Sequence, residues 1–126
     1  MFFTRPLLQA TTKVTTGLTG IPVHPNPRPH LIQTYNTTLS TLSRFPEHAV
    51  YRQATEGFTR TRLAIVEANE NVTDIETKIG CGQIEQLILQ AEDELKLVGK
   101  MEQWKPWEQL ETPIPEGQWK YPGNKE

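Results

Sequence analysis

The chain has 126 residues, of which 36% are hydrophobic, and its 13 Lys and Arg against 15 Asp and Glu give a formal net charge of −2. This length fits one domain with tails, and the charge argues against a general nucleic-acid binder, which would carry a basic face. The single cysteine, Cys81, excludes an internal disulfide and a cysteine-rich zinc site and is typical of a reducing compartment. The longest aliphatic run, Leu63–Val66, is far too short to span a bilayer.

Residues 1–29 are predicted to be a basic, acid-free lead-in. Residues 1–46 contain no Asp or Glu and have a net charge of +4, whereas the remainder of the chain has a net charge of −6. Phe and Leu residues beside Arg5 and Lys13 give the start the composition of a mitochondrial import signal. A disordered terminus that simply lacks acids explains the same composition equally well. Four prolines between positions 22 and 29 favour an extended path.

Three helices are expected between the lead-in and the tail, near residues 30–44, 47–69 and 83–104. Apolar residues recur in each at the spacings of three and four that place side chains on one helical face. Thr73-Asp74-Ile75-Glu76 has the capping-box pattern and is expected to open only a short helical turn that ends at Ile79. Pro106 cannot continue a helix and should end the third one near Trp104.

These patterns predict an all-α protein, an antiparallel three-helix bundle over residues 30–104, with no period-two run that would indicate a strand. The expected core residues are the apolar residues on the helical faces: Leu31, Tyr35, Leu39, Leu42, Tyr51, Phe58, Ile65, Ile84, Leu87, Ile88, Leu95 and Val98.

Residues 105–126 are predicted to be an extended docking tail. The segment has four prolines and no periodicity, yet with the end of the third helix it holds all three tryptophans of the chain. Free disordered tails contain few aromatic residues, and Trp and Tyr are typical interface anchors. The expected partner interface comprises Leu97, Met101, Trp104, Lys105, Pro106, Trp107, Trp119 and Tyr121. The alternative, that Trp104 and Trp107 fold back over their own helix, stays open.

No pattern in the chain indicates catalysis or a cofactor. A phosphate-binding glycine loop is missing, and the three histidines are scattered without a cluster of acidic ligands. Cys81 and His48 could form a nucleophile pair, but no residue that would orient His48 is visible, so a passive thiol is the favoured interpretation. The sequence therefore predicts no catalytic, metal-binding or cofactor-binding residue.

Several motifs resemble one known family. The run from Gly82 to Leu95, GQIEQLILQAEDEL, and Trp104-Lys105-Pro106-Trp107-Glu108 closely resemble the thirteen-kilodalton alpha-subcomplex subunit five of mitochondrial NADH:ubiquinone oxidoreductase, respiratory complex I. Thr15–Leu18, Ala49–Arg52 and Gln118–Lys120 are similar to further motifs of this family. The resemblance extends from Lys13 to Pro122, whereas the proline-rich stretch and the residues before Lys13 depart from the animal pattern.

The resemblance implies a non-catalytic accessory subunit without a redox centre. Such a subunit would lie peripherally on the matrix side of the mitochondrial inner membrane, in the peripheral arm of complex I. Its partners would be core and accessory subunits near the quinone-reducing module. Independently of the resemblance, the net charge and the short apolar runs predict no nucleic-acid partner and no direct membrane span. The resemblance also implies import without cleavage of a presequence. Val50-Tyr51-Arg52 differs from the Leu-Tyr-Arg motif of acyl-carrier-binding proteins in its first residue, so that partner is not expected. A free-standing assembly factor or helical adaptor is the alternative function.

Overall fold

The structure is a computed structural model that describes residues 14–118 and 122–123. These residues form four helices and no strand: α1 (Pro27–Leu42), α2 (Val50–Ala68), α3 (Val72–Ile79) and α4 (Ile84–Trp104). The predicted all-α class is therefore confirmed. Within the described ranges, no helix combines the length and the apolar character that a membrane crossing requires.

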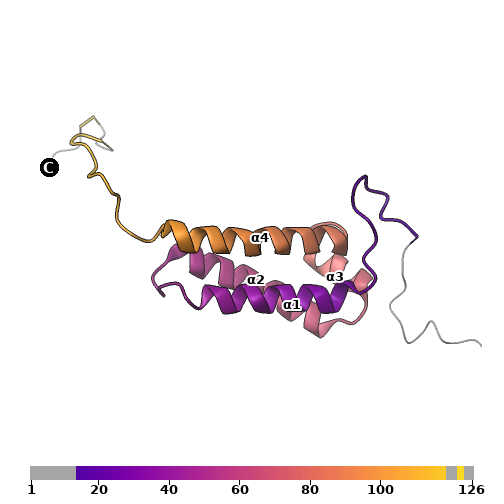
Figure 1. The fold of residues 1–126 in the computed structure, drawn as a ribbon. Helices are drawn as coiled ribbons and strands as arrows, with labels where there is room; N and C mark the ends of the chain where they lie inside the picture. Colours follow the sequence, from indigo (N-terminus) through magenta and orange to yellow (C-terminus); the bar gives the residue numbers. More distant parts are fainter. Residues whose placement is uncertain (1–13, 119–121, 124–126) are drawn as a thin grey trace, which may run out of the picture.

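The three long helices lie side by side (Figure 1). The chain reverses direction between α1 and α2 and again around α3, so α2 runs opposite to α1 and α4, while α1 and α4 are parallel. Helix α1 packs against both α2 and α4, and α3 contacts the facing ends of α2 and α4. Helix α1 is thus the central element of the fold.

The segment that was expected to be a short turn is a helix of its own, α3. Asn71 rather than Thr73 caps it, because the Asn71 side chain accepts a hydrogen bond from the Thr73 amide at 3.0 Å. Gly80 ends the helix in the left-handed conformation, with φ of 72°. The Glu76 carboxylate instead accepts a hydrogen bond from the Ile84 amide at 2.9 Å, so it caps the start of α4.

Helix α1 begins at Pro27, three residues before the predicted position. Proline suits the first turn of a helix because the amide that it lacks would have no partner there. The buried threonines of α1 are accommodated because their hydroxyls bond within the helix, Thr34 Oγ1 to the His30 carbonyl at 2.9 Å and Thr38 Oγ1 to the Thr34 carbonyl at 2.8 Å. Packing on one side therefore outweighs the poor helix propensity of this sequence.

Arg28 connects the start of α1 to the end of α2. Its Nε donates to the carbonyls of Val66 at 3.1 Å and Asn69 at 3.0 Å, and its Nη2 donates to the carbonyl of Glu67 at 3.2 Å. The last carbonyls of a helix have no partner within the helix. The guanidinium supplies these partners and fixes the α1–α2 hairpin at its open end.

The interior consists of two apolar clusters. The larger one, around α3, contains Leu31, Tyr35, Val66, Ile75, Ile84, Leu87, Ile88 and Ala91. The smaller one, near the end of α4, contains Leu42, Phe45 and Val98, with Tyr51, Met101 and Trp107 packed against it. Of the residues expected in the core, the structure buries Leu31, Tyr35, Leu42, Ile84, Leu87, Ile88 and Val98, and it leaves Leu39, Tyr51, Ile65 and Leu95 partly accessible.

Phe58 does not lie in the core as expected, because 48% of its surface is exposed. The buried residues of α2 are Thr55, Thr59 and Val66. Threonine side chains are small, and their hydroxyls can donate to backbone carbonyls of the same helix. The face of α2 that contains Thr55 and Thr59 can therefore pack against α1. The face that includes Phe58 is turned outward in consequence, and the Arg62 guanidinium lies 4.1 Å above the Phe58 ring.

Candidate interaction surfaces

The outer side of the last turns of α4 presents apolar side chains to solvent. Leu97 is exposed, Met101 is partly buried against the smaller cluster, and Trp104 is 64% exposed. Their spacing of four and three places them along one strip of the helix. Trp is a typical anchor of protein interfaces because it buries a large area with few rotatable bonds. This strip, residues 97, 101 and 104, is hereafter called the α4 strip.

Trp107 behaves differently from Trp104. Lys105 ends α4 in the left-handed conformation, with φ of 50°, and its amide donates to the Met101 carbonyl at 2.9 Å. A turn then closes with the Glu108 amide on the Lys105 carbonyl at 3.1 Å. This turn lays the Trp107 ring on that of Phe45, with 5.1 Å between the ring centroids and 52° between the ring planes. Trp107 therefore packs against its own domain, whereas Trp104 is exposed, so the alternative in which both tryptophans fold back agrees with the structure only at Trp107.

The remainder of the expected interface is exposed or lies outside the described residues. Lys105 and Pro106 are exposed, and Trp119 and Tyr121 belong to the part of the chain that is not described. Leu110, which is 71% exposed, and Ile114 add apolar surface that the sequence prediction missed. The only available signal was the presence of two aliphatic residues between prolines, in a segment where polar residues are the norm.

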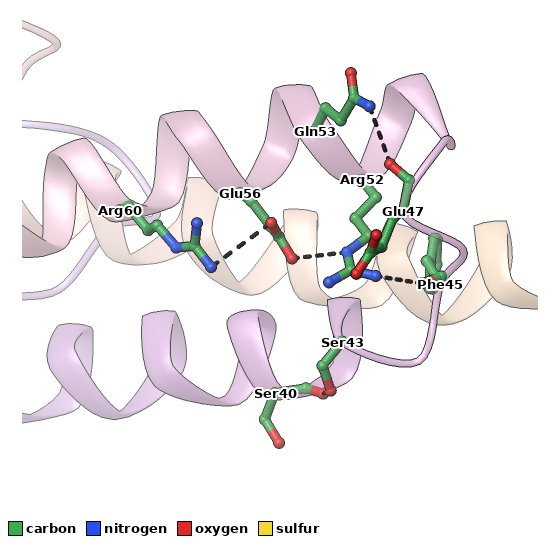
Figure 2. Close-up of polar contacts among 8 residues, drawn as sticks. All are labelled: Ser40, Ser43, Phe45, Glu47, Arg52, Gln53, Glu56 and Arg60. Atoms are coloured by element: carbon green, nitrogen blue, oxygen red, sulfur yellow. Dashed lines mark hydrogen bonds and ion pairs between the residues drawn. The ribbon is translucent and has the colours of Figure 1, made fainter.

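A polar network, shown in Figure 2, holds Phe45, the residue on which Trp107 packs. Arg52 donates through Nη1 to the Phe45 carbonyl at 2.5 Å and through Nε to Glu56 Oε1 at 2.9 Å. Arg60 lies 3.6 Å from the other Glu56 oxygen. The network holds the backbone of Phe45 in place below the tryptophan ring. Arg52 of the Val50-Tyr51-Arg52 motif is thus engaged inside the domain, and sequence reasoning had missed both Arg52 and Phe45.

Tyr51 bridges α2 and α4. Its hydroxyl donates to Glu94 Oε1 at 2.5 Å. Burial and the adjacent Glu94 carboxylate both disfavour the phenolate and raise the pKa of Tyr51 above its ordinary value of 10.0. A second bridge between these helices runs from Arg62 Nη1 to Gln90 Oε1 at 3.1 Å. Two polar side-chain contacts therefore join α2 to α4.

Cys81 and His48, the two residues considered as a nucleophile pair, lie far apart in the structure. Cys81 is exposed in the connection between α3 and α4, where Arg62 Nη2 lies 3.3 Å from its sulfur. His48 lies in the connection between α1 and α2, at the opposite end of the long helices (Figure 1). Among the described residues, no group of three His, Cys, Asp or Glu side chains is placed to bind a metal ion. The features that stand out are apolar and suited to binding other proteins.

Comparison with known proteins relates this chain to subunits of respiratory complex I. Residues 20–86 match the family model described as the ETC complex I subunit conserved region. The chain is 50% identical over 120 residues to NADH dehydrogenase [ubiquinone] 1 alpha subcomplex subunit MCI4 of Candida albicans, covering 94% of this chain and 86% of that protein. It is 46% identical over 110 residues to NADH dehydrogenase [ubiquinone] 1 alpha subcomplex subunit 5 of Mus musculus, covering 87% of this chain and 95% of the mouse protein.

A plant relative extends the comparison. The probable mitochondrial NADH dehydrogenase [ubiquinone] 1 alpha subcomplex subunit 5 of Arabidopsis thaliana is 50% identical over 103 residues, covering 82% of this chain and 60% of that protein. The family match, together with the extent and level of these identities, confirms the family resemblance that the sequence indicated. The chain belongs to the family of complex I accessory subunits known as alpha subcomplex subunit 5.

Proposed function

We propose that this chain is a non-catalytic accessory subunit in the peripheral matrix arm of mitochondrial complex I. It supports electron transfer from NADH to ubiquinone structurally, by binding core and accessory subunits near the quinone-reducing module. The observation that carries the proposal is the identity of 50% over 94% of the chain with a protein named as a complex I alpha subcomplex subunit. No cofactor is part of the proposal.

The exposed apolar side chains support a role in binding other proteins. The exposed hydrophobic residues outside the two core clusters include Phe58, Leu97, Trp104, Leu110 and Ile114. Exposed apolar surface of this kind commonly marks protein interaction sites. We assign docking to the α4 strip together with the tail after Glu108, including Trp119 and Tyr121. Trp107 has a different role, because its contact with Phe45 holds the start of the tail on the helical domain.

The proposed location is the matrix face of the inner membrane, with attachment through other subunits. The basic, acid-free composition of residues 1–46 supports mitochondrial import. The exposed apolar residues would be covered by neighbouring proteins rather than by lipid in this arrangement. The helical unit of the proposal extends from Pro27 to Trp104, and residues 109–126 are its docking tail.

Incorporation of a tagged chain into native complexes tests the proposal. In mitochondria whose own copy has been deleted, the tagged chain should migrate with fully assembled complex I on native gels, in a one-to-one ratio to a core subunit. NADH:ubiquinone activity should fall without it and return with it. An assembly factor would instead associate only with intermediates that lack other subunits, and this pattern would contradict the proposal.

Truncation separates docking from folding. A chain that ends at Glu108 keeps Trp107 on Phe45 and loses the rest of the tail. We expect it to melt like the full chain and to fail to enter the complex. A chain that ends at Lys105 is the comparison, because it also loses the Trp107–Phe45 contact and should melt at a lower temperature. Normal incorporation of the chain ending at Glu108 would exclude the tail as an anchor.

A further inference from the structure

Helices α2 and α3 form an open groove of about 370 Å³. Phe58, Ile65 and Ile79 supply its apolar lining. Gly57 lines the groove on the α2 side without a side chain, and a Cβ atom added there would meet nothing within 4 Å. The groove therefore offers apolar surface and room for a partner's backbone to approach α2 closely.

The charged residues that line the groove are both basic, Arg62 and Lys78. Their hydrogen bonds go to neutral groups: Arg62 contacts Gln90 Oε1 at 3.1 Å and Cys81 Sγ at 3.3 Å, and Lys78 Nζ contacts Asn69 Oδ1 at 2.7 Å. Among the described residues, neither cation has a carboxylate oxygen within 4.0 Å. In the part of the chain that the structure describes, the groove therefore carries two cations that have no ion-pair partner, although the net charge of the chain is −2.

We propose that this groove is the docking site for an acidic, amphipathic segment of another protein. Apolar side chains of that segment would cover Phe58, Ile65 and Ile79, and its carboxylates would pair with Arg62 and Lys78. Both kinds of contact would then form at once, and the bond of a cation to a carboxylate is stronger than the bonds that Arg62 and Lys78 make here to uncharged acceptors.

The charge of the groove also discriminates between occupants. The first 13 residues of the chain are apolar enough to compete for it, but they contain Arg5 and Lys13 and no acid. Like charges brought together at an interface are unfavourable. The chain's own N-terminal segment is therefore a poor occupant, and an acidic partner is the complementary one. This inference deepens the proposed function, on which it rests for the assembly that contains the partner.

Zero-length crosslinking tests the site directly. In intact mitochondria, a carbodiimide joins an amine to a carboxylate only where the two are in contact. We expect mass spectrometry to find Lys78 joined to an Asp or Glu of another protein. In the same sample, native gels show whether the chain is in complex I, so failure of the docking site and failure of the proposed function are read separately.

The alternative results each overturn the docking proposal. Lys78 joined only to a carboxylate of its own chain, or to a second copy of the chain, would contradict it. So would an uncrosslinked Lys78 that reacts with an acetylating reagent as readily in mitochondria as in the purified chain, because an occupied groove would protect it.

Charge variants provide an independent measurement. Lys78→Glu should weaken capture of the crosslinked partner about tenfold or more, since it places like charges in contact. Lys78→Arg keeps the charge and should retain binding. Lys96→Glu is the matched control, because it makes the same change in charge on the exposed face of α4 and should leave capture unaffected. Equal capture by the Lys78→Glu and Lys96→Glu variants would refute the charge pairing.

Discussion

Trp107 packs on Phe45, with 5.1 Å between the ring centroids, so the first turn after α4 is fastened to the loop between α1 and α2. The neighbouring tryptophan, Trp104, lies on the last turn of α4 and is 64% exposed. Two tryptophans three residues apart therefore have different environments, and the same substitution at each separates folding from docking.

We expect Trp107→Ala to lower the free energy of unfolding of the isolated chain by about 1–3 kcal/mol, because a partly buried aromatic pair is lost. Trp104→Ala should change it by less than about 0.5 kcal/mol, since an exposed side chain contributes little, yet it should reduce incorporation into the complex. Chemical denaturation and native gels measure the two effects. Equal destabilisation by both substitutions would contradict the assignment.

A second matched pair lies within α4. Leu87 is 0% exposed and Leu89 is 45% exposed. Leu87→Ala should cost about 2–5 kcal/mol of stability, because it removes buried methyl groups and leaves a cavity. Leu89→Ala should cost less than about 0.5 kcal/mol. Urea unfolding followed by circular dichroism would measure both values, and a large effect at Leu89 would mean that α4 is rotated relative to the structure.

Stability should decline at alkaline pH because of Tyr35 and Tyr51. Burial raises the pKa of Tyr35, although the Arg62 guanidinium partly offsets it, and burial together with Glu94 raises the pKa of Tyr51. Above the ordinary tyrosine pKa of 10.0, the unfolded chain releases protons that the folded chain retains, so the unfolded state gains stability as the pH rises.

Tyr51→Phe should make this alkaline decline shallower, because one of the two titrating groups is lost. At neutral pH the same variant should lose about 0.5–1.5 kcal/mol, since the hydrogen bond to Glu94 is gone. Melting temperatures at pH 8 and at several pH values above 10 check both statements. An alkaline decline as steep in Tyr51→Phe as in the natural chain would show that Tyr51 titrates normally.

Two glycines should respond in opposite directions to replacement by alanine. Gly82 has a φ of 100°, and a Cβ atom there would meet Gln86 Oε1, which accepts the hydrogen bond from the Gln83 amide that caps α4. Gly82→Ala should therefore destabilise the chain by more than about 1 kcal/mol. Gly57 lies inside α2 with open space around it, so Gly57→Ala should raise stability by about 0.5–1 kcal/mol. Thermal unfolding of both variants measures these opposite shifts.

The sequence predicts α4 well because its two faces differ clearly in polarity. Ile84, Leu87, Ile88 and Val98 repeat at helical spacing and are all buried. Pro106 follows directly on the end of the helix, and the structure ends α4 at Trp104 as expected. Where apolar periodicity and a helix stop agree, pattern reasoning locates both the element and its buried side.

Helix α2 is predicted less well because its interior side is polar in sequence. Thr55 and Thr59 are buried, whereas Phe58 is on the outside. A periodicity argument ranks phenylalanine above threonine and so selects the wrong face. The packing surface that decides between them belongs to α1, which carries its own buried threonines, and the sequence of α2 alone does not contain that information.

The candidate docking surface is predicted only in part, and for a related reason. Aromatic residues at the end of α4 indicate an interface, but their type does not reveal that Trp107 would meet Phe45 and Trp104 would meet solvent. That difference depends on the left-handed conformation of Lys105, a residue type that seldom adopts it. The basic groove between α2 and α3 depends on tertiary structure to an even greater degree.

The parallel pairing of α1 with α4 influences the order in which the chain folds. Helices α1 and α2 are joined by a short loop and fastened by Arg28, so they can form a hairpin at a small cost in loop-closure entropy. Helix α4 can pack along α1 only after residues 43–83 have returned to the starting end. We therefore expect the hairpin to form in the folding transition state and α4 to join afterwards. Substitutions at Leu31 in α1 would then slow folding, whereas substitutions at Val98 in α4 would mainly speed unfolding.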